Sequence, residues 1–160
     1  QLDRTEIFKY LGEKLPNIKL NNGKNIASIK LYTPEPTPEL KGIKNMGKIH
    51  YMYEMPLVFK CSKINLNITL RSIRNGIPLR AIDIMGAGGF LLTNHQNDFT
   101  MHFVDGEHYV SYSDREDMLD KIKYYLEHED ERKAIARNGC KEVREHHTYR
   151  QRLSEIIGSI

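Results

Sequence analysis

Residues 76–94, GIPLRAIDIMGAGGFLLTN, combine a proline-led helix, closely spaced glycines and a short apolar strand. Pro78 fits the first position of the helix, because its missing N–H and its fixed φ cost nothing there. Arg80 then falls in the first turn, where the positive end of the helix dipole disfavours a cation. Its position therefore calls for a compensating negative charge.

Two interpretations supply that charge. Arg80 and Asp83 are three residues apart and share one face of the helix, so they can form a surface ion pair contributing about 0.3 to 0.5 kcal/mol. Alternatively, Arg80 and free backbone N–H groups hold an anion at the helix amino end, and Asp83 accepts hydrogen bonds from hydroxyls of the same ligand. The residues alone leave both interpretations open.

The glycines of this stretch follow the helix and precede the strand. A dinucleotide fingerprint needs its glycines between a strand and the start of a helix, where backbone N–H groups meet a pyrophosphate. Gly86, Gly88 and Gly89 are therefore predicted to form a helix end and a tight turn into the strand.

Working outward, the clearest strand is SKINLNITL, residues 62–70, in which apolar residues alternate with asparagines and a threonine. Shorter strand patterns occupy residues 25–34, 42–51, 89–94 and 107–112, and residues 53–62 form a short amphipathic stretch. Strands alternating with helices at this spacing predict an α/β fold with a parallel sheet covered on both faces.

Helix starts are marked by capping patterns. The pairs are Asp3 with Glu6, Ser113 with Glu116 and Thr148 with Gln151. Gly139 is expected to end or bend the helix between the last two starts.

Composition excludes several classes of protein. The 160 residues carry 24 basic and 21 acidic side chains, a net charge of +3, which lacks the basic excess of nucleic-acid binding proteins. No apolar run approaches the roughly 20 residues of a membrane span. Cys61 and Cys140, with no signal peptide before them, indicate a cytoplasmic protein. The seven histidines lack the spacing of metal ligands, so no metal or cofactor is predicted.

Three long segments in order, residues 62–94, 106–139 and 146–153, resemble the carboxy-terminal domain of the CgeB-like, spore-maturation-type glycosyltransferases. The resemblance runs from about Asp3 to Leu153. It implies one half of a GT-B enzyme, in which two Rossmann-like domains face each other across a cleft and the carboxy-terminal domain holds the nucleotide-sugar donor. The chain, opening on Gln1 in mid-pattern, is then expected to be a fragment that lacks its amino-terminal domain.

The same resemblance implies roles for individual residues. Arg80, with Leu79 at the start of its helix, would lie beside the donor diphosphate as the catalytic group. Asp83 would bind the ribose. Further donor-binding residues are implied at Gly47 and the backbone of Lys48 to Tyr51 beside the base, at Arg4 near the phosphates, and at Asn67 to Asn75 along the sugar. Asn75 stands where relatives carry the first of two acidic residues.

We therefore expect a glycosyltransferase domain that binds a nucleoside-diphosphate sugar, with UDP as the favoured nucleotide, and serves a bacterial cell-surface glycan pathway. The acceptor, whether glycan, protein or small molecule, and the general base belong to the absent amino-terminal domain, so the isolated domain should not catalyse transfer. Residues 149–160 are expected to form a terminal helix that packs on that domain. One alternative is a non-catalytic nucleotide-sugar-binding or protein-interaction module of the same fold, and another is a regulatory α/β domain that binds no sugar nucleotide.

Overall fold

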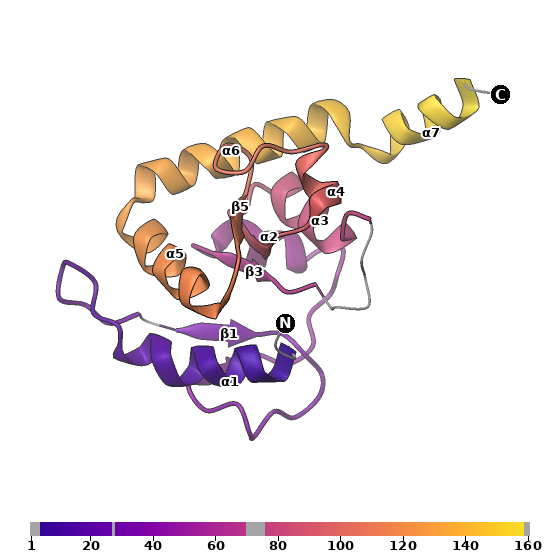
Figure 1. The fold of residues 1–160 in the computed structure, drawn as a ribbon. Coiled ribbons are helices and arrows are strands. Elements are labelled where there is room, and N and C mark those ends of the chain that lie inside the picture. Colours follow the sequence, from indigo (N-terminus) through magenta and orange to yellow (C-terminus); the bar gives the residue numbers. More distant parts are fainter. Residues whose placement is uncertain (1–3, 27, 70–75, 159–160) are drawn as a thin grey trace.

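The computed structural model describes residues 4–26, 28–69 and 76–158 (Figure 1). The helices are α1 (Arg4–Lys14), the 3₁₀ turn η1 (Leu15–Asn17), α2 (Met55–Cys61), α3 (Leu79–Gly86), α4 (Asn97–Thr100), α5 (Arg115–Glu127), α6 (Glu129–His146) and α7 (Tyr149–Gly158). The strands are β1 (Ile29–Leu31), β2 (Ile43–Asn45), β3 (Asn65–Asn67), β4 (Leu91–Asn94) and β5 (Val110–Tyr112).

All the paired strands of the described chain run parallel. β4 lies between β3 and β5, with Asn65 opposite Leu91 and Leu92 opposite Val110. β1 and β2 form a separate two-stranded sheet, with Ile29 opposite Ile43. The parallel α/β organisation predicted from the alternation of strands and helices is confirmed.

Both faces of the central sheet are packed by helices (Figure 1). Leu91 and Leu92 are both fully buried although they are neighbours, because successive strand residues point to opposite faces. Leu92 joins a core formed with α1 and α5, and Leu91 joins a second core formed with α2, α3 and α4. Residues of α6 contribute to both cores, Ile135 to the first and Val143 to the second.

Gly139 does not end a helix, so that part of the prediction is wrong. α6 continues through Gly139, which is buried. A Cβ atom there would lie 2.3 Å from the backbone oxygen of His108. The glycine is needed for close approach of α6 to the chain before β5.

Two helix starts are displaced by one residue from their predicted positions. The cap of α5 is Asp114, whose side chain accepts a hydrogen bond from the Asp117 N–H at 2.9 Å, and not Ser113. Ser113 lies one residue earlier and donates its own N–H to the Asp117 carboxylate. Pro78 precedes α3 as its cap, because its ψ of 125° is extended. The helix α4 was not predicted.

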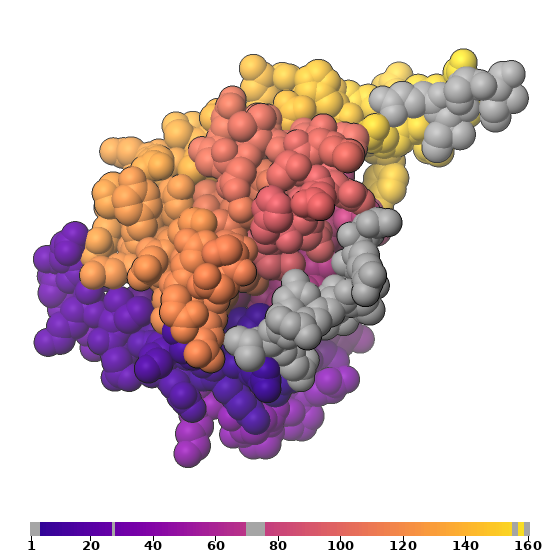
Figure 2. Space-filling view, in the orientation of Figure 1, coloured from indigo at the N-terminus to yellow at the C-terminus, as the bar shows by residue number. Residues whose placement is uncertain are grey.

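The terminal helix α7 projects beyond the rest of the molecule, as the yellow segment in Figures 1 and 2. Its predicted capping box is confirmed: the Thr148 N–H donates to the Gln151 side chain at 2.8 Å. Tyr149, Leu153 and Ile157 are exposed. In the described part of the chain, no helix combines the length and the hydropathy needed to cross a bilayer.

Candidate functional site

The amphipathic sequence of α3 determines which of its side chains face solvent. Ala81, Ile84 and Met85 are fully buried in the second core. Arg80 is exposed and Asp83 is half-buried, on the part of the helix surface that the core leaves open. The two residues singled out from the sequence are therefore available to a ligand.

The carboxyl end of α3 is fixed by α6. The Gly86 carbonyl accepts hydrogen bonds from the Arg144 guanidinium at 3.3 and 3.4 Å and from the Cys140 thiol at 3.5 Å. Gly88 follows with a φ of 84°, and a Cβ atom on Gly89 would lie 2.7 Å from the Phe59 carbonyl. The prediction that these glycines form a helix end and a tight turn is confirmed.

The amino end of α3 is more open. The Pro78 carbonyl accepts the first helical hydrogen bond, from Ala81 N–H at 2.9 Å. The amides of Leu79 and Arg80 precede that bond, and the first N–H groups of a helix have no partner within it. Leu79 itself is 65% exposed, so the amino end of α3 lies at the surface of the protein and is not enclosed by the core.

Arg80 is held by aromatic rings and a thioether instead of a carboxylate. Its guanidinium carbon lies 5.6 Å from the ring centre of Tyr51 and 5.8 Å from that of Phe59, and its Nη1 lies 3.9 Å from the Met55 sulfur. The ion pairs within 4.0 Å among the described residues do not include Arg80. The ion pair with Asp83, one of the two interpretations of the sequence, is absent.

Asp83 has a different partner. The Tyr51 hydroxyl donates a hydrogen bond to Asp83 Oδ2. This bond, with burial and the negative charge of Asp83 adding to it, raises the pKa of the Tyr51 phenol, and Arg80 opposes the increase. The structure thus brings Tyr51, Arg80 and Asp83 together, from segments almost thirty residues apart in the sequence.

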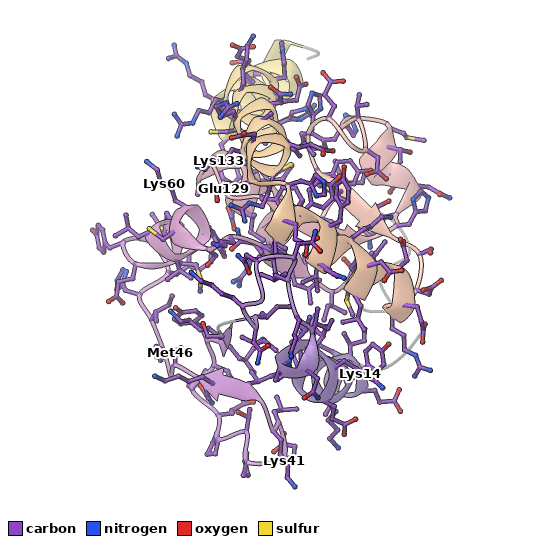
Figure 3. The ribbon with its side chains drawn as sticks, turned by 90° about the vertical axis from the view of Figure 1, so that its left-hand side faces the viewer. Lys14, Lys41, Met46, Lys60, Glu129 and Lys133 are labelled. Carbon is purple, nitrogen blue, oxygen red and sulfur yellow. The ribbon has the colours of Figure 1, made fainter. Side chains whose placement is uncertain are left out.

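The segment that carries Tyr51 leads from β2 to α2. In Figure 3 it runs between the labelled Met46, just after β2, and Lys60, near the end of α2. Gly47 has a φ of 77° and donates its N–H to the Asn45 side chain at 2.8 Å. Lys48 is exposed. Gly47 thus has the left-handed backbone conformation that glycine tolerates, in the segment that precedes Tyr51.

Arg4 and Asn67 lie at the carboxyl end of β3. Arg4 Nη2 donates to the Ile68 carbonyl at 3.0 Å. Asn67 is buried, and its side-chain amide donates to the hydroxyls of Thr69 at 3.2 Å and Thr93 at 3.0 Å. Asn67 therefore supports the end of the strand from inside the protein. Asn75 lies outside the described residues.

Met55 and Phe59 were missed as contributors to the site. Both lie on α2, and the amphipathic pattern of residues 53–62 was the only signal for them in the sequence. That pattern indicated a buried face, but the position of this face beneath Arg80 depends on the packing of α2 against α3.

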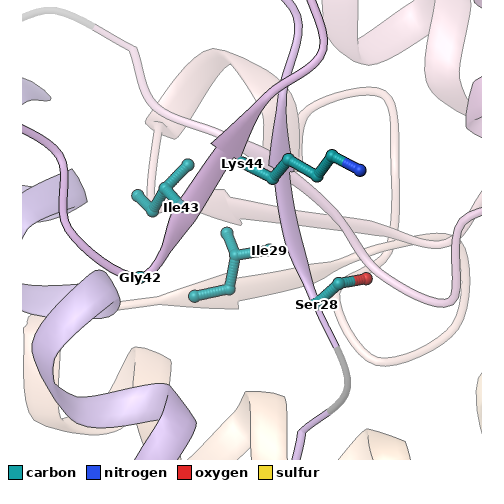
Figure 4. Close-up of a pocket in the computed structure, with 5 residues that line it drawn as sticks. All are labelled: Ser28, Ile29, Gly42, Ile43 and Lys44. Carbon is teal, nitrogen blue, oxygen red and sulfur yellow. The ribbon is translucent and has the colours of Figure 1, made fainter. Parts of the chain in front are cut away.

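A hollow of about 370 Å³ lies elsewhere, beside the two-stranded sheet (Figure 4). It is lined by Ser28, Ile29, Gly42, Ile43 and Lys44. None of the predicted donor-binding residues lines it, so it is separate from the candidate site. Within the described ranges, no three His, Cys, Asp or Glu side chains are grouped as metal ligands.

A comparison with known protein families shows to which family this chain belongs. The profile of the family described as "Glycosyl transferase-like" matches residues 9–158, which is nearly the whole sequence. The chain belongs to this family. No match was found among curated proteins.

Solved structures agree on the fold. The chain is similar to Anabaena HepE, whose crystal structure is a complex with UDP and glucose, with a TM-score of 0.61 and 11% sequence identity. It is also similar to the C-terminal domain of LpcC, a glycosyl transferase group 1 family protein of Francisella tularensis, with a TM-score of 0.55 and 21% identity. At these identities the likeness shows the fold, which is the Rossmann-like α/β fold of a GT-B glycosyltransferase domain.

The matches cover part of each protein. They include 74% of this chain and 32% of the HepE chain, and 68% of this chain and 55% of the LpcC domain. The chain therefore spans about a third of the length of HepE and little more than half of the LpcC domain.

Proposed function

We propose that this glycosyltransferase-family domain binds the nucleoside-diphosphate sugar donor, with UDP as the nucleotide, for transfer of the sugar to an acceptor. The observation that carries the proposal is the amino end of α3, where Arg80 is exposed and has no carboxylate partner within 4.0 Å in the described chain. Such a cation beside free helical N–H groups favours an anionic ligand.

Diphosphate chemistry fits this end of the helix. As the bond from the sugar to the diphosphate breaks, negative charge develops on the leaving group. The Arg80 guanidinium and the amides of Leu79 and Arg80 are donors that are already in position, so they stabilise this charge without reorganisation. Arg80 is accordingly the proposed catalytic residue.

The remaining contacts with the nucleotide sugar follow from placing its diphosphate at the amino end of α3. Asp83, one turn along α3, accepts hydrogen bonds from the ribose hydroxyls, and the backbone from Gly47 and Lys48 to Tyr51 borders the base. Arg4, at the start of α1 and bonded to the Ile68 carbonyl just after β3, is proposed to approach the phosphates. The sugar contacts proposed for Asn67 and Asn75 require groups other than the Asn67 amide nitrogen, which donates to two hydroxyls inside the protein.

The assignment to the CgeB-like branch of the family is part of this proposal and rests on the sequence resemblance. So does the role in a cell-surface glycan, whereas the proposed cytoplasmic location rests on the free cysteines Cys61 and Cys140. The acceptor and the general base are assigned to an amino-terminal domain, against which the exposed side chains Leu153 and Ile157 of α7 would pack. The proposal includes no metal ion at this site.

A non-catalytic donor-binding module is the second candidate, and Asn75 is the residue that favours it. An asparagine cannot supply the negative charge of the carboxylate found in relatives at that position. Turnover by the full-length protein separates the two candidates, since both predict nucleotide binding by this domain.

Calorimetric titration with UDP, CDP, ADP and GDP tests the proposal. We expect measurable binding of UDP, weaker binding of the other three nucleotides, and no sugar transfer by the domain alone. Asp83→Asn should weaken UDP binding while the unfolding temperature stays unchanged. Failure of all four nucleotides to bind would contradict the proposal.

A further inference from the structure

Tyr51 contacts both Asp83 and Arg80 in the candidate site. Its hydroxyl donates to Asp83 Oδ2, and its ring lies against the Arg80 guanidinium. If the proposed function holds, these are the groups that receive the ribose and the diphosphate. A phenol hydroxyl therefore stands where a ribose hydroxyl would bind.

We propose that Tyr51 is a displaceable occupant of the donor site, which competes with the nucleotide for Asp83. In the free protein its hydroxyl satisfies the carboxylate. When a nucleoside diphosphate binds, the ribose hydroxyls replace the phenol and the Tyr51 side chain rotates away. This inference rests on the proposed function and adds a residue that sets the affinity for the donor.

The contacts of Tyr51 are suited to such a rotation. The side chain is 48% exposed, and its hydrogen-bond and ring contacts are with Asp83 and Arg80 alone within the described chain. The neighbouring backbone is fixed independently, because the His50 N–H donates to the Glu54 carboxylate. Rotation of the side chain therefore breaks one hydrogen bond and one cation–π contact without moving the loop.

The neighbouring Tyr53 shows that the arrangement is specific to one position. Tyr53 is 76% exposed and stacks on His50, with ring centres 4.7 Å apart. Within the described chain, no hydrogen bond or ring contact joins it to Asp83 or Arg80. The two tyrosines of one turn thus differ in the features that matter here, because only Tyr51 bonds to Asp83 and lies against Arg80.

Competition has a calculable consequence for affinity. A ligand that must first displace Tyr51 binds with an apparent Kd equal to its intrinsic Kd divided by the fraction of molecules in which Asp83 is free. A ribose offers two hydroxyl donors against the single donor of the phenol, so it can displace Tyr51 but loses part of its affinity. Removing the phenol hydroxyl should therefore restore the affinity that is lost to this competition.

The test is calorimetric titration of UDP into the wild-type protein and the variants Tyr51→Phe and Tyr53→Phe. We expect Tyr51→Phe to bind UDP about fivefold more tightly, as for a free fraction of about one fifth. Tyr53→Phe should bind as the wild type does. In an Asp83→Ala background, Tyr51→Phe should no longer increase affinity, because position 83 then carries no acceptor for the phenol hydroxyl.

The outcomes separate this inference from the proposed function. If the wild type binds UDP and Tyr51→Phe binds equally or more weakly, Tyr51 is not a competitor and the inference is wrong, whereas the proposed function stands. If neither the wild type nor any variant binds a nucleoside diphosphate, the proposed function is wrong and the inference is lost with it. An equal gain in Tyr53→Phe would also overturn the inference, since the effect would not depend on Asp83.

Discussion

The two ends of α3 are built in opposite ways. At the carboxyl end, the Gly86 carbonyl accepts hydrogen bonds from Arg144 and Cys140 of α6, and Gly89 fits where no side chain could. At the amino end, Arg80 contacts two rings and a sulfur but no carboxylate within 4.0 Å in the described chain. Arg144, which donates to a carbonyl, stabilises the fold. Arg80, which has no oxygen partner among its contacts in the described chain, is available to a ligand.

The largest expected effect is on the packed side, where α6 supports α3. Gly139→Ala places a Cβ atom 2.3 Å from the His108 oxygen, so it should lower the free energy of unfolding by at least about 2 kcal/mol although alanine favours helices. Chemical denaturation measures the change. Gly158→Ala is the matched control, because no atom lies within 4 Å of the added carbon. Equal stability of the two variants would mean that α6 does not approach the chain before β5 this closely.

Alkaline pH should lower the free energy of unfolding through Tyr109, which lies on the packed side of α3. Burial raises the pKa of Tyr109, which packs in one core with Ile84 and Met85 of α3, from 10.0 to about 12. Since the folded protein holds this proton more tightly than the unfolded chain, the stabilisation is complete below pH 10 and is lost as the pH rises to 12. The loss is about 2 to 3 kcal/mol.

Denaturation as a function of pH, with Tyr109→Phe as the comparison, measures this contribution. The variant cannot ionise at this position, so its stability should fall less between pH 10 and 12. A wild type and a variant with identical pH profiles would contradict the assignment to Tyr109.

A smaller effect is expected at the open end. The Asp83 hydrogen bond is the main cause of the raised pKa of Tyr51, so Asp83→Asn should lower that pKa toward the ordinary value of a tyrosine. Tyr51 is exposed, and the change should leave the unfolding temperature unaffected. A pH titration of ring-labelled tyrosine, followed by NMR, measures this pKa. The Tyr51→Phe variant identifies the signal of Tyr51. An unchanged pKa would show that the hydrogen bond is not formed in solution.

The sequence was sufficient for the features that depend on local pattern. The alternation in residues 62–70 and the position of the glycines after α3 predicted β3 and the turn into β4. The sequence also singled out Arg80 and Asp83, because a cation in the first turn of a helix is a local anomaly.

Features that depend on tertiary contacts were not predictable in the same way. The sequence predicts that Gly139 ends or bends a helix, because nothing in it shows that α6 passes close to His108. The hydrogen bond from Tyr51 to Asp83 and the ring of Phe59 beneath Arg80 arise only when α2 and the segment before it pack against α3. The resemblance had implied a role for the backbone at Tyr51, but the contacts of its side chain with Asp83 and Arg80 were visible only in the structure.

The most direct test of the contrast between the two ends of α3 compares Arg80→Ala with Arg144→Ala, the same substitution at opposite ends of the helix. Arg80→Ala should weaken UDP binding about tenfold in calorimetric titration, through loss of a charge-assisted contact, with little change in unfolding temperature. Arg144→Ala should bind UDP as the wild type does and lose about 1 kcal/mol of stability, because its hydrogen bonds to the Gly86 carbonyl are removed. Equal binding of UDP by Arg80→Ala and the wild type would contradict the assignment of the open end of α3 to the donor.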